Sequence, residues 1–241
     1  MASHDIIKQS SRIAGLVKDK DHALKHKLGE ILIEILIIVF AISLSLFFDR
    51  WRQNVENRKQ ESVFLEGLKI DLTNDVEQLK ASERKWAMMR KDARYFIQPE
   101  NLINWNRDTI NFYSRDLFHN VYFFPSTNRY EALKSTGKID IIENPQLQNA
   151  IIDLYQTKIP DLTQQVTFFN EFLNTQTMNF LIENLQRDDN SNPILDKHFF
   201  TNMKFRNILI FYNGIDDVQK RADSTIRLSE SILTLLNKRP N

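Results

Sequence analysis

Two glutamates stand four residues apart at the start of the longest apolar stretch of the chain, residues 28–48 (LGEILIEILIIVFAISLSLFF). In a helix, Glu30 and Glu34 lie on one face, and Ala41 and Ser45 continue that face. A carboxylate inside a membrane normally faces a partner or an ion path, and small residues four apart let membrane helices approach closely. We therefore expect these four residues to form a helix–helix interface. The alternative is that Glu30 lies at the lipid headgroups and Glu34 extends toward it.

The remaining residues with metal-binding or acid–base chemistry are isolated. His22 and His26 have the spacing of two metal ligands on a helix, but no third ligand is close in sequence. His119 and His198 stand alone among aromatic residues, and the pair Asp188-Asp189 fits a solvated loop better than a cation site. The chain contains no glycine-rich phosphate loop, nucleophile elbow or zinc-protease motif. The sequence predicts no catalytic residue, no metal site, no bound cofactor and no enzyme activity.

An aromatic cluster in the middle of the chain allows two interpretations. It lines a ligand cavity, or it fills the core of a helical bundle, which is the simpler interpretation. Its members are Trp105, Phe112, Tyr113, Phe118, Tyr122, Phe123 and Phe124.

Residues 28–48 are long enough to span a bilayer, whose apolar core requires about 20 helical residues. Phe47 and Phe48 at the end of the stretch, and Trp51 just after it, lie where an aromatic belt is expected. No small-residue cleavage site is present. We interpret the stretch as an uncleaved signal-anchor. Lysines and arginines flank it in nearly equal number, so the orientation rests on the commoner bacterial arrangement, with a short basic N-terminus inside and a long exported domain.

A heptad pattern follows the apolar stretch up to about Ile97. One seam position holds Leu65, Leu72, Leu79, Trp86 and Ala93, and the other holds Leu68, Met89 and Phe96. Asp75 and Ser82 interrupt the second position, which favours a bundle over a strict coiled coil. Because only Gly67 interrupts residues 30–97, we expect the membrane helix and the first bundle helix to be one continuous helix.

Further helices are predicted over residues 101–118, 127–135, 145–180 and 199–236. Gly137 would terminate the second. Asn144 and Pro145 would start the third, which Pro160 restarts or kinks. We expect residues 187–193 to form a loop and the last helix to bend near Asn213-Gly214. Residues 121–124 (VYFF) resemble a strand without an obvious partner.

The amino-acid composition argues against several classes of function. Thirty-two basic and 31 acidic residues nearly cancel, so a nucleic-acid partner is not indicated. The absence of cysteine excludes disulfides and thiol chemistry, and is compatible with a periplasmic location.

Several short patterns resemble a family of uncharacterised single-pass membrane proteins common in Bacteroidota. They are Gly29-Glu30-Ile31 before the apolar span, Trp51 and Arg58-Lys59 after it, the repeat Leu65, Leu68, Asp71-Leu72, and the stretch from Tyr130 to Gly137. The resemblance covers residues 28–157. It implies a membrane-anchored helical protein and carries no known activity or functional residue.

The sequence thus predicts an all-α protein with a flexible or amphipathic arm (1–27), a transmembrane signal-anchor (28–48) and an up-and-down helical bundle (49–241). Leu65, Leu68, Leu72, Leu79, Trp86 and Met89 form the seam of the bundle. We expect a scaffold or assembly subunit of the bacterial inner membrane, with its C-terminal domain in the periplasm. It would act through contacts with copies of itself or with other membrane proteins. Two alternatives stay open: a ligand-sensing bundle, and a proton- or ion-conducting oligomer that uses Glu34.

Overall fold

The computed structural model describes the backbone of residues 2–103, 106–194 and 196–238, and within these ranges the side chains from Leu32 onward. The chain divides into two compact units, residues 1–59 and residues 60–241. Each unit is described by itself below.

The first unit consists of the N-terminal part of helix α1 (Ala2–Ile97). Every residue from 32 to 48 has an exposed side chain. Among the described residues, Leu32–Ile97 is the one helix long and apolar enough to cross a membrane, and its most apolar 18-residue window has a mean hydropathy of 2.4. Helix α1 has no non-helical residue between Phe48 and Leu65, so the predicted continuity is confirmed.

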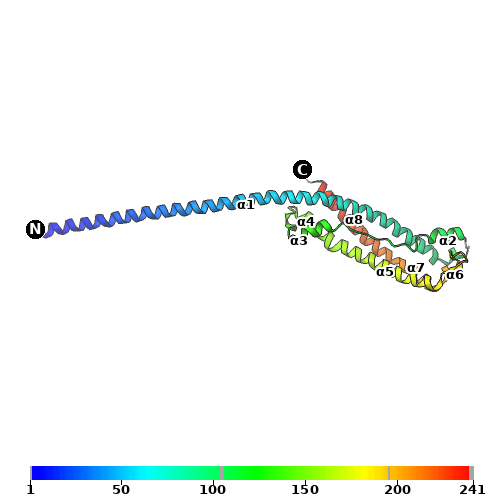
Figure 1. Ribbon diagram of the computed structural model, residues 1–241. Helices are drawn as coiled ribbons and strands as arrows, with labels where there is room; N and C mark the ends of the chain where they lie inside the picture. Colours follow the sequence, from blue (N-terminus) through cyan, green and yellow to red (C-terminus); the bar gives the residue numbers. More distant parts are fainter. Residues whose placement is uncertain (1, 104–105, 195, 239–241) are drawn as a thin grey trace. The chain divides into compact units, whose positions relative to one another are not determined.

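The second unit is a helical bundle built on three long helices (Figure 1). These are the C-terminal part of α1, helix α5 (Ile159–Asn184) and helix α8 (Ile215–Asn237). The shorter helices are α2 (Arg107–Ser114), α3 (Asn128–Ser135), α4 (Pro145–Asp153), α6 (Lys197–Thr201) and α7 (Met203–Phe211). The predicted all-α class is confirmed, with one addition: a hairpin of two short strands, β1 (Gln186–Arg187) and β2 (Pro193–Ile194).

The chain passes along the bundle in an up-and-down order in which one pass is not a helix. Residues 119–127, which we call the strap, form neither a helix nor a strand, and Figure 1 shows them as a long irregular pass along the bundle. They run antiparallel to α1, since Tyr122 lies near Ser82 and Ser126 near Asp75. They also run antiparallel to α5, since Asn120 contacts Asn174 and Val121 contacts Asn170. Helices α1 and α5 are therefore parallel to each other, and α8 returns antiparallel to both.

Two groups of buried side chains form the core of the second unit. The larger group contains Trp86 and Met89 of α1, Phe169 and Phe180 of α5, and Val218 of α8. The smaller group joins Leu65, Leu68 and Leu72 of α1 to Tyr130 of α3 and Ile151 of α4. Both groups exclude water from the apolar face of each amphipathic helix, which is the main source of bundle stability.

The structure corrects the helix predicted over residues 101–118. A 3₁₀ turn occupies Pro99–Leu102, and α2 begins after Asn106, whose side chain accepts hydrogen bonds from the amides of Asp108 and Thr109. This N-cap starts a separate helix, because it satisfies amides that a continuous helix would bond to preceding carbonyls.

The long helix predicted over residues 199–236 is also interrupted. The expected bend at Asn213-Gly214 is present as a 3₁₀ turn, Tyr212–Gly214, before α8. A second break at Asn202 was not predicted. The extended backbone of Asn202 separates α6 from α7, and its side chain caps α7 by accepting a hydrogen bond from the amide of Lys204.

Other turn signals are confirmed. Gly137 has a φ of +67°, in the left-handed region that glycine adopts freely, and it follows α3. Asn144 caps α4 through the amides of Gln146 and Leu147. Pro160 restarts the helix: a π-helical turn, Leu154–Lys158, precedes α5, because proline has no N–H to donate to the carbonyl four residues earlier.

Candidate functional site

The strap alternates between buried side chains and side chains that face outward. Val121 and Phe123 are buried, each 5% exposed, whereas Tyr122 and Phe124 are exposed. This alternation is the two-residue period of an extended chain. The rings of Tyr122 and Phe124 lie on the same side and stack with their centroids 5.8 Å apart.

The backbone of the strap is held by polar side chains from two helices rather than by a neighbouring strand. The amide of Phe124 donates to Oε1 of Gln78 at 2.8 Å, and Nδ2 of Asn170 donates to the carbonyl of Val121 at 3.0 Å. The hydroxyl of Ser82 lies 3.5 Å from the carbonyl of Tyr122. Buried backbone groups need such partners, so these side chains replace the bonds of a sheet.

Asp75 fixes the end of the strap. Its carboxylate accepts hydrogen bonds from the amide of Ser126 at 3.0 Å and from the Ser126 hydroxyl at 2.9 Å. Burial raises the pKa of Asp75, and the two bonds from Ser126 oppose that rise. The hydroxyl of Tyr155 donates to the carbonyl of Ser126 at 3.3 Å. Asp75 and Ser82, which interrupt the heptad pattern, are therefore the residues that bind an extended neighbour.

Arg129, just after the strap, lies across α1 at Gly67. Its Nε donates to Asp71 at 2.9 Å. A Cβ atom at position 67 would come within 2.1 Å of the Arg129 guanidinium carbon, so a larger residue there would displace the end of the Arg129 side chain from this position. Beside it, the ring of Tyr130 stacks on Tyr155 with centroids 4.5 Å apart.

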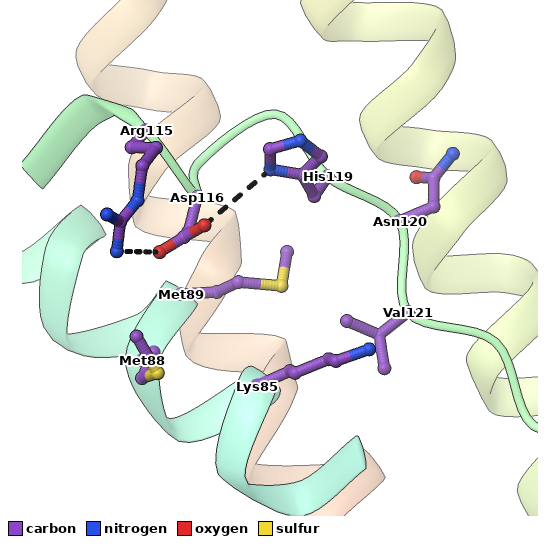
Figure 2. A pocket seen from close by; sticks show the side chains of 8 residues that line it. All are labelled: Lys85, Met88, Met89, Arg115, Asp116, His119, Asn120 and Val121. Atoms are coloured by element: carbon purple, nitrogen blue, oxygen red, sulfur yellow. Dashed lines mark hydrogen bonds and ion pairs between the residues drawn. The ribbon is translucent and has the colours of Figure 1, made fainter. Parts of the chain in front are cut away.

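A pocket of about 420 Å³ opens between α1 and residues 115–121 (Figure 2). Lys85, Met88 and Met89 of α1 line one side. Figure 2 shows the ammonium group of Lys85 and the thioether of Met89 pointing into this space. The volume lies within the range of about 300–1,000 Å³ that small-molecule sites occupy.

Charged groups surround the pocket. The carboxylate of Asp116 lies 3.3 Å from the guanidinium of Arg115 and 3.8 Å from Nδ1 of His119. Asp92 is buried on α1 one turn beyond Met88. Burial, and then the charge of Asp116, raise the pKa of Asp92 to about 6.

A second, smaller cavity of about 40 Å³ lies on the other side of residues 117–120, against α5. Thr177 lines it, and the hydroxyl oxygen of Thr177 is buried without a hydrogen-bond partner among the described residues. A cavity of this size accommodates one water-sized polar group. His119 and Asn120 line both the cavity and the larger pocket.

The sequence-predicted site residues fall into two groups. All six seam residues, Leu65, Leu68, Leu72, Leu79, Trp86 and Met89, are buried in the bundle core. Glu34, Ala41 and Ser45 are exposed on α1, and the interface predicted for them stays a prediction. The side chain of Glu30 lies outside the described residues.

The aromatic cluster is divided by the structure, so neither interpretation holds for all of it. Phe123 is in the core, and Tyr113 and Phe118 pack against it. Phe112, Tyr122 and Phe124 are exposed. Trp105 lies outside the described residues.

The histidines and aspartates that are isolated in the sequence lie in different parts of the structure. His119 lies at the pocket, which its position in the sequence did not indicate, and His198 is exposed on α6. Asp188 closes the β1–β2 hairpin by accepting hydrogen bonds from the amides of Asn190 and Asn192, and these bonds lower its pKa. In the described part of the chain no group of three or more metal-ligating side chains occurs. His22 and His26 lie outside the described side chains.

Sequence reasoning missed the strap and the pocket because both depend on contacts between distant segments. The one signal was the pair of polar residues at seam positions 75 and 82, with Gln78 between them. Buried polar side chains need hydrogen-bond partners, and in this structure the backbone of the strap supplies them.

Comparison with known proteins supports the part of the resemblance noted above that concerns a family of unknown function. No curated protein and no solved structure is significantly similar to this chain. Residues 34–213 match a family model described as a family of unknown function, DUF6090. That match begins within the apolar part of α1, covers the strap and the pocket, and ends just before α8. The chain belongs to the DUF6090 family.

Proposed function

We propose that this protein is a membrane-anchored helical scaffold that acts through protein–protein contacts. The observation that carries the proposal is the apolar segment of α1: the side chains of residues 32–48 are exposed, and none of its most apolar 18-residue window is buried. A soluble protein rarely exposes so large an apolar surface, whereas a bilayer covers it. Trp51 and Arg52 follow at the point where interfacial residues are enriched.

The bundle supplies a surface suited to a protein partner. We define the strap surface as four side chains that are each about half or more exposed: Tyr122 and Phe124 of the strap, Met88, which lines the pocket, and Met178, which lines the small cavity. Aromatic residues and methionine are enriched in protein interfaces. Tyr122 and Phe124 are held by the anchored strap, so little conformational entropy is lost when a partner binds.

The membrane is the bacterial inner membrane in this proposal, with the bundle on the periplasmic side. The support is the family resemblance and the commoner arrangement of signal-anchored proteins. A reporter that is active only in the periplasm, fused after Asn241, tests the orientation. Activity of a cytoplasm-only reporter at the same position would reverse it.

Photocrosslinking in native membranes tests the scaffold. A photoreactive phenylalanine analogue replaces Tyr122 or Phe124, and Glu77, exposed on α1, serves as the control position. We expect the same protein to be crosslinked from positions 122 and 124 and not from 77, with the partner identified by mass spectrometry. Equal yields from all three positions, or none from 122 and 124, would rule out the strap surface as the contact.

A further inference from the structure

The pocket between α1 and residues 115–121 has the features of a small-molecule site. It is about 420 Å³ in volume, and its lining combines apolar side chains, Met88, Met89 and Val121, with charged ones. Met89 and Val121 are buried, 1% and 5% exposed, so the inner wall is apolar. Sites of this kind bind a ligand's apolar body and orient it through a few polar groups.

Lys85 and Arg115 offset Asp116 and the nearby Asp92 in charge, so the pocket is distinguished by how its lining residues pair and not by its net charge. Asp116 is already engaged by Arg115 and lies near His119. No ion pair to Lys85 is found within the described residues, and its ammonium group points into the pocket (Figure 2). An anionic group placed beside Lys85 and Arg115 would receive charge-assisted hydrogen bonds without displacing a partner of Lys85.

A second observation indicates that this end of the bundle is built around a polar space. The Thr177 hydroxyl is buried without a partner in the described structure and lines the cavity behind His119 and Asn120. Thr177 as a whole is only 6% exposed. Leaving a buried hydroxyl unpaired costs about 1–3 kcal/mol, and the small cavity has room for one water-sized group that would pair with it.

We propose that this pocket binds a small amphipathic organic anion, such as a carboxylate on an apolar chain or ring. Lys85 and Arg115 hold the anionic head, and Met88, Met89 and Val121 contact the apolar body. The site lies entirely within the bundle and does not depend on the membrane anchor or on a protein partner, so it goes beyond the scaffold function.

The chain offers a site-specific way to test this. It has five methionines, of which Met88 and Met89 line the pocket, Met178 lines the small cavity, and Met203 lies on α7 and lines neither. The full chain is labelled with ¹³C on its methionine methyl groups, placed in lipid nanodiscs and titrated with 4-phenylbutyrate. The uncharged 4-phenylbutanol is the matched probe.

We expect 4-phenylbutyrate to shift the Met88 and Met89 methyl signals in a saturable way while the Met203 signal stays unchanged. The alcohol should bind at least about fivefold more weakly, and Lys85→Gln should weaken binding of the acid by roughly five- to tenfold. Lys91→Gln, an exposed residue of α1 outside the pocket, is the control and should bind like the wild type. Non-saturable shifts, equal affinity for acid and alcohol, or unchanged binding by Lys85→Gln would each overturn the proposal.

Discussion

Gly67 looks unfavourable for a helix in the sequence, but the structure shows a contact that uses it. In a helix interior, glycine costs about 1 kcal/mol relative to alanine, so the sequence alone presents it as a tolerated defect. The structure shows a use for it, because the Arg129 guanidinium crosses the helix there to reach Asp71.

Gly67→Ala should therefore fail to stabilise the protein. The gain of about 1 kcal/mol in helix propensity is offset by displacement of the Arg129 side chain and loss of its ion pair. In an Arg129→Ala background, the same substitution should give the full gain. Thermal unfolding in detergent of the wild type, the two single variants and the double variant measures how the effect of Gly67→Ala on stability depends on Arg129. A full gain from Gly67→Ala in the wild-type background would show that Arg129 does not require the glycine.

Glu83 of α1 and Asp223 of α8 line the same surface recess, where their two carboxyl groups interact. Burial, and then Asp223, raise the pKa of Glu83 from 4.5 to about 7. The folded state therefore holds this proton more tightly than the unfolded state does. The resulting stability is fully present below pH 4.5 and is lost as the pH rises through about 7.

Glu83→Gln should remove this pH dependence, because glutamine keeps a donor for Asp223 and cannot ionise. We expect the melting temperature of the variant to exceed that of the wild type by about 2–4 °C at pH 8, and the two to coincide below pH 4.5. Glu77→Gln, exposed on the same helix, is the control and should show no such difference. A constant offset at all pH values would contradict the shared proton.

At the scale of the element, the strap is the part of the fold that differs most from expectation. The sequence indicated a strand at residues 121–124 without a partner, and the structure places this segment between two helices. The strap can run alongside α1 because the two segments between their shared contacts are of similar length. The 7 residues from Asp75 to Ser82 rise about 10 Å in a helix, and the 4 residues from Tyr122 to Ser126 span about 13 Å when extended.

Asp75→Ala should destabilise the protein by about 2–3 kcal/mol, because the amide and hydroxyl of Ser126 lose their acceptor. Asp75→Asn should cost less than about 1 kcal/mol, since its amide oxygen still accepts one of these bonds and burial of a charge is avoided. Urea unfolding measures both variants. Amide hydrogen exchange should increase at residues 124–126 in the alanine variant first. Equal losses for the two variants would show that the Asp75 acceptor does not hold the strap.

In the apolar part of α1, Glu34, Ala41 and Ser45 are predicted to form a helix–helix interface. If their face packs against another membrane helix, Glu34→Gln should preserve membrane insertion and weaken assembly. Replacing Ala41 and Ser45 by leucine should also weaken assembly, because larger side chains keep the helices apart. Ile42→Leu, on another face, is the control. Crosslinking in membranes is the measurement, and crosslinked species unchanged in all variants would mean that this face is not an interface.

At the scale of the whole molecule, the features predicted from sequence were those that depend on neighbouring residues. The continuous α1, the end of α3 at Gly137, the start of α4 at Asn144 and the bend near Asn213 each have a local cause, a cap, a proline or a glycine. The strap, the pocket beside Lys85 and the contact of Arg129 with Gly67 join segments more than 25 residues apart in the sequence. Their partners are set by packing, which no local pattern specifies.

Membrane anchoring by α1 is the central claim, and extraction of membranes with alkaline carbonate tests it most directly. The wild-type chain should remain in the pellet, whereas a variant with Ile38→Arg and Ile42→Arg should move to the soluble fraction, because charged residues in the bilayer core cost several kcal/mol. The matched control is Val63→Arg with Ile70→Arg, which changes two equally exposed apolar residues of the same helix beyond the apolar segment and should leave the protein in the pellet. Release of the wild-type chain by carbonate would contradict the anchor.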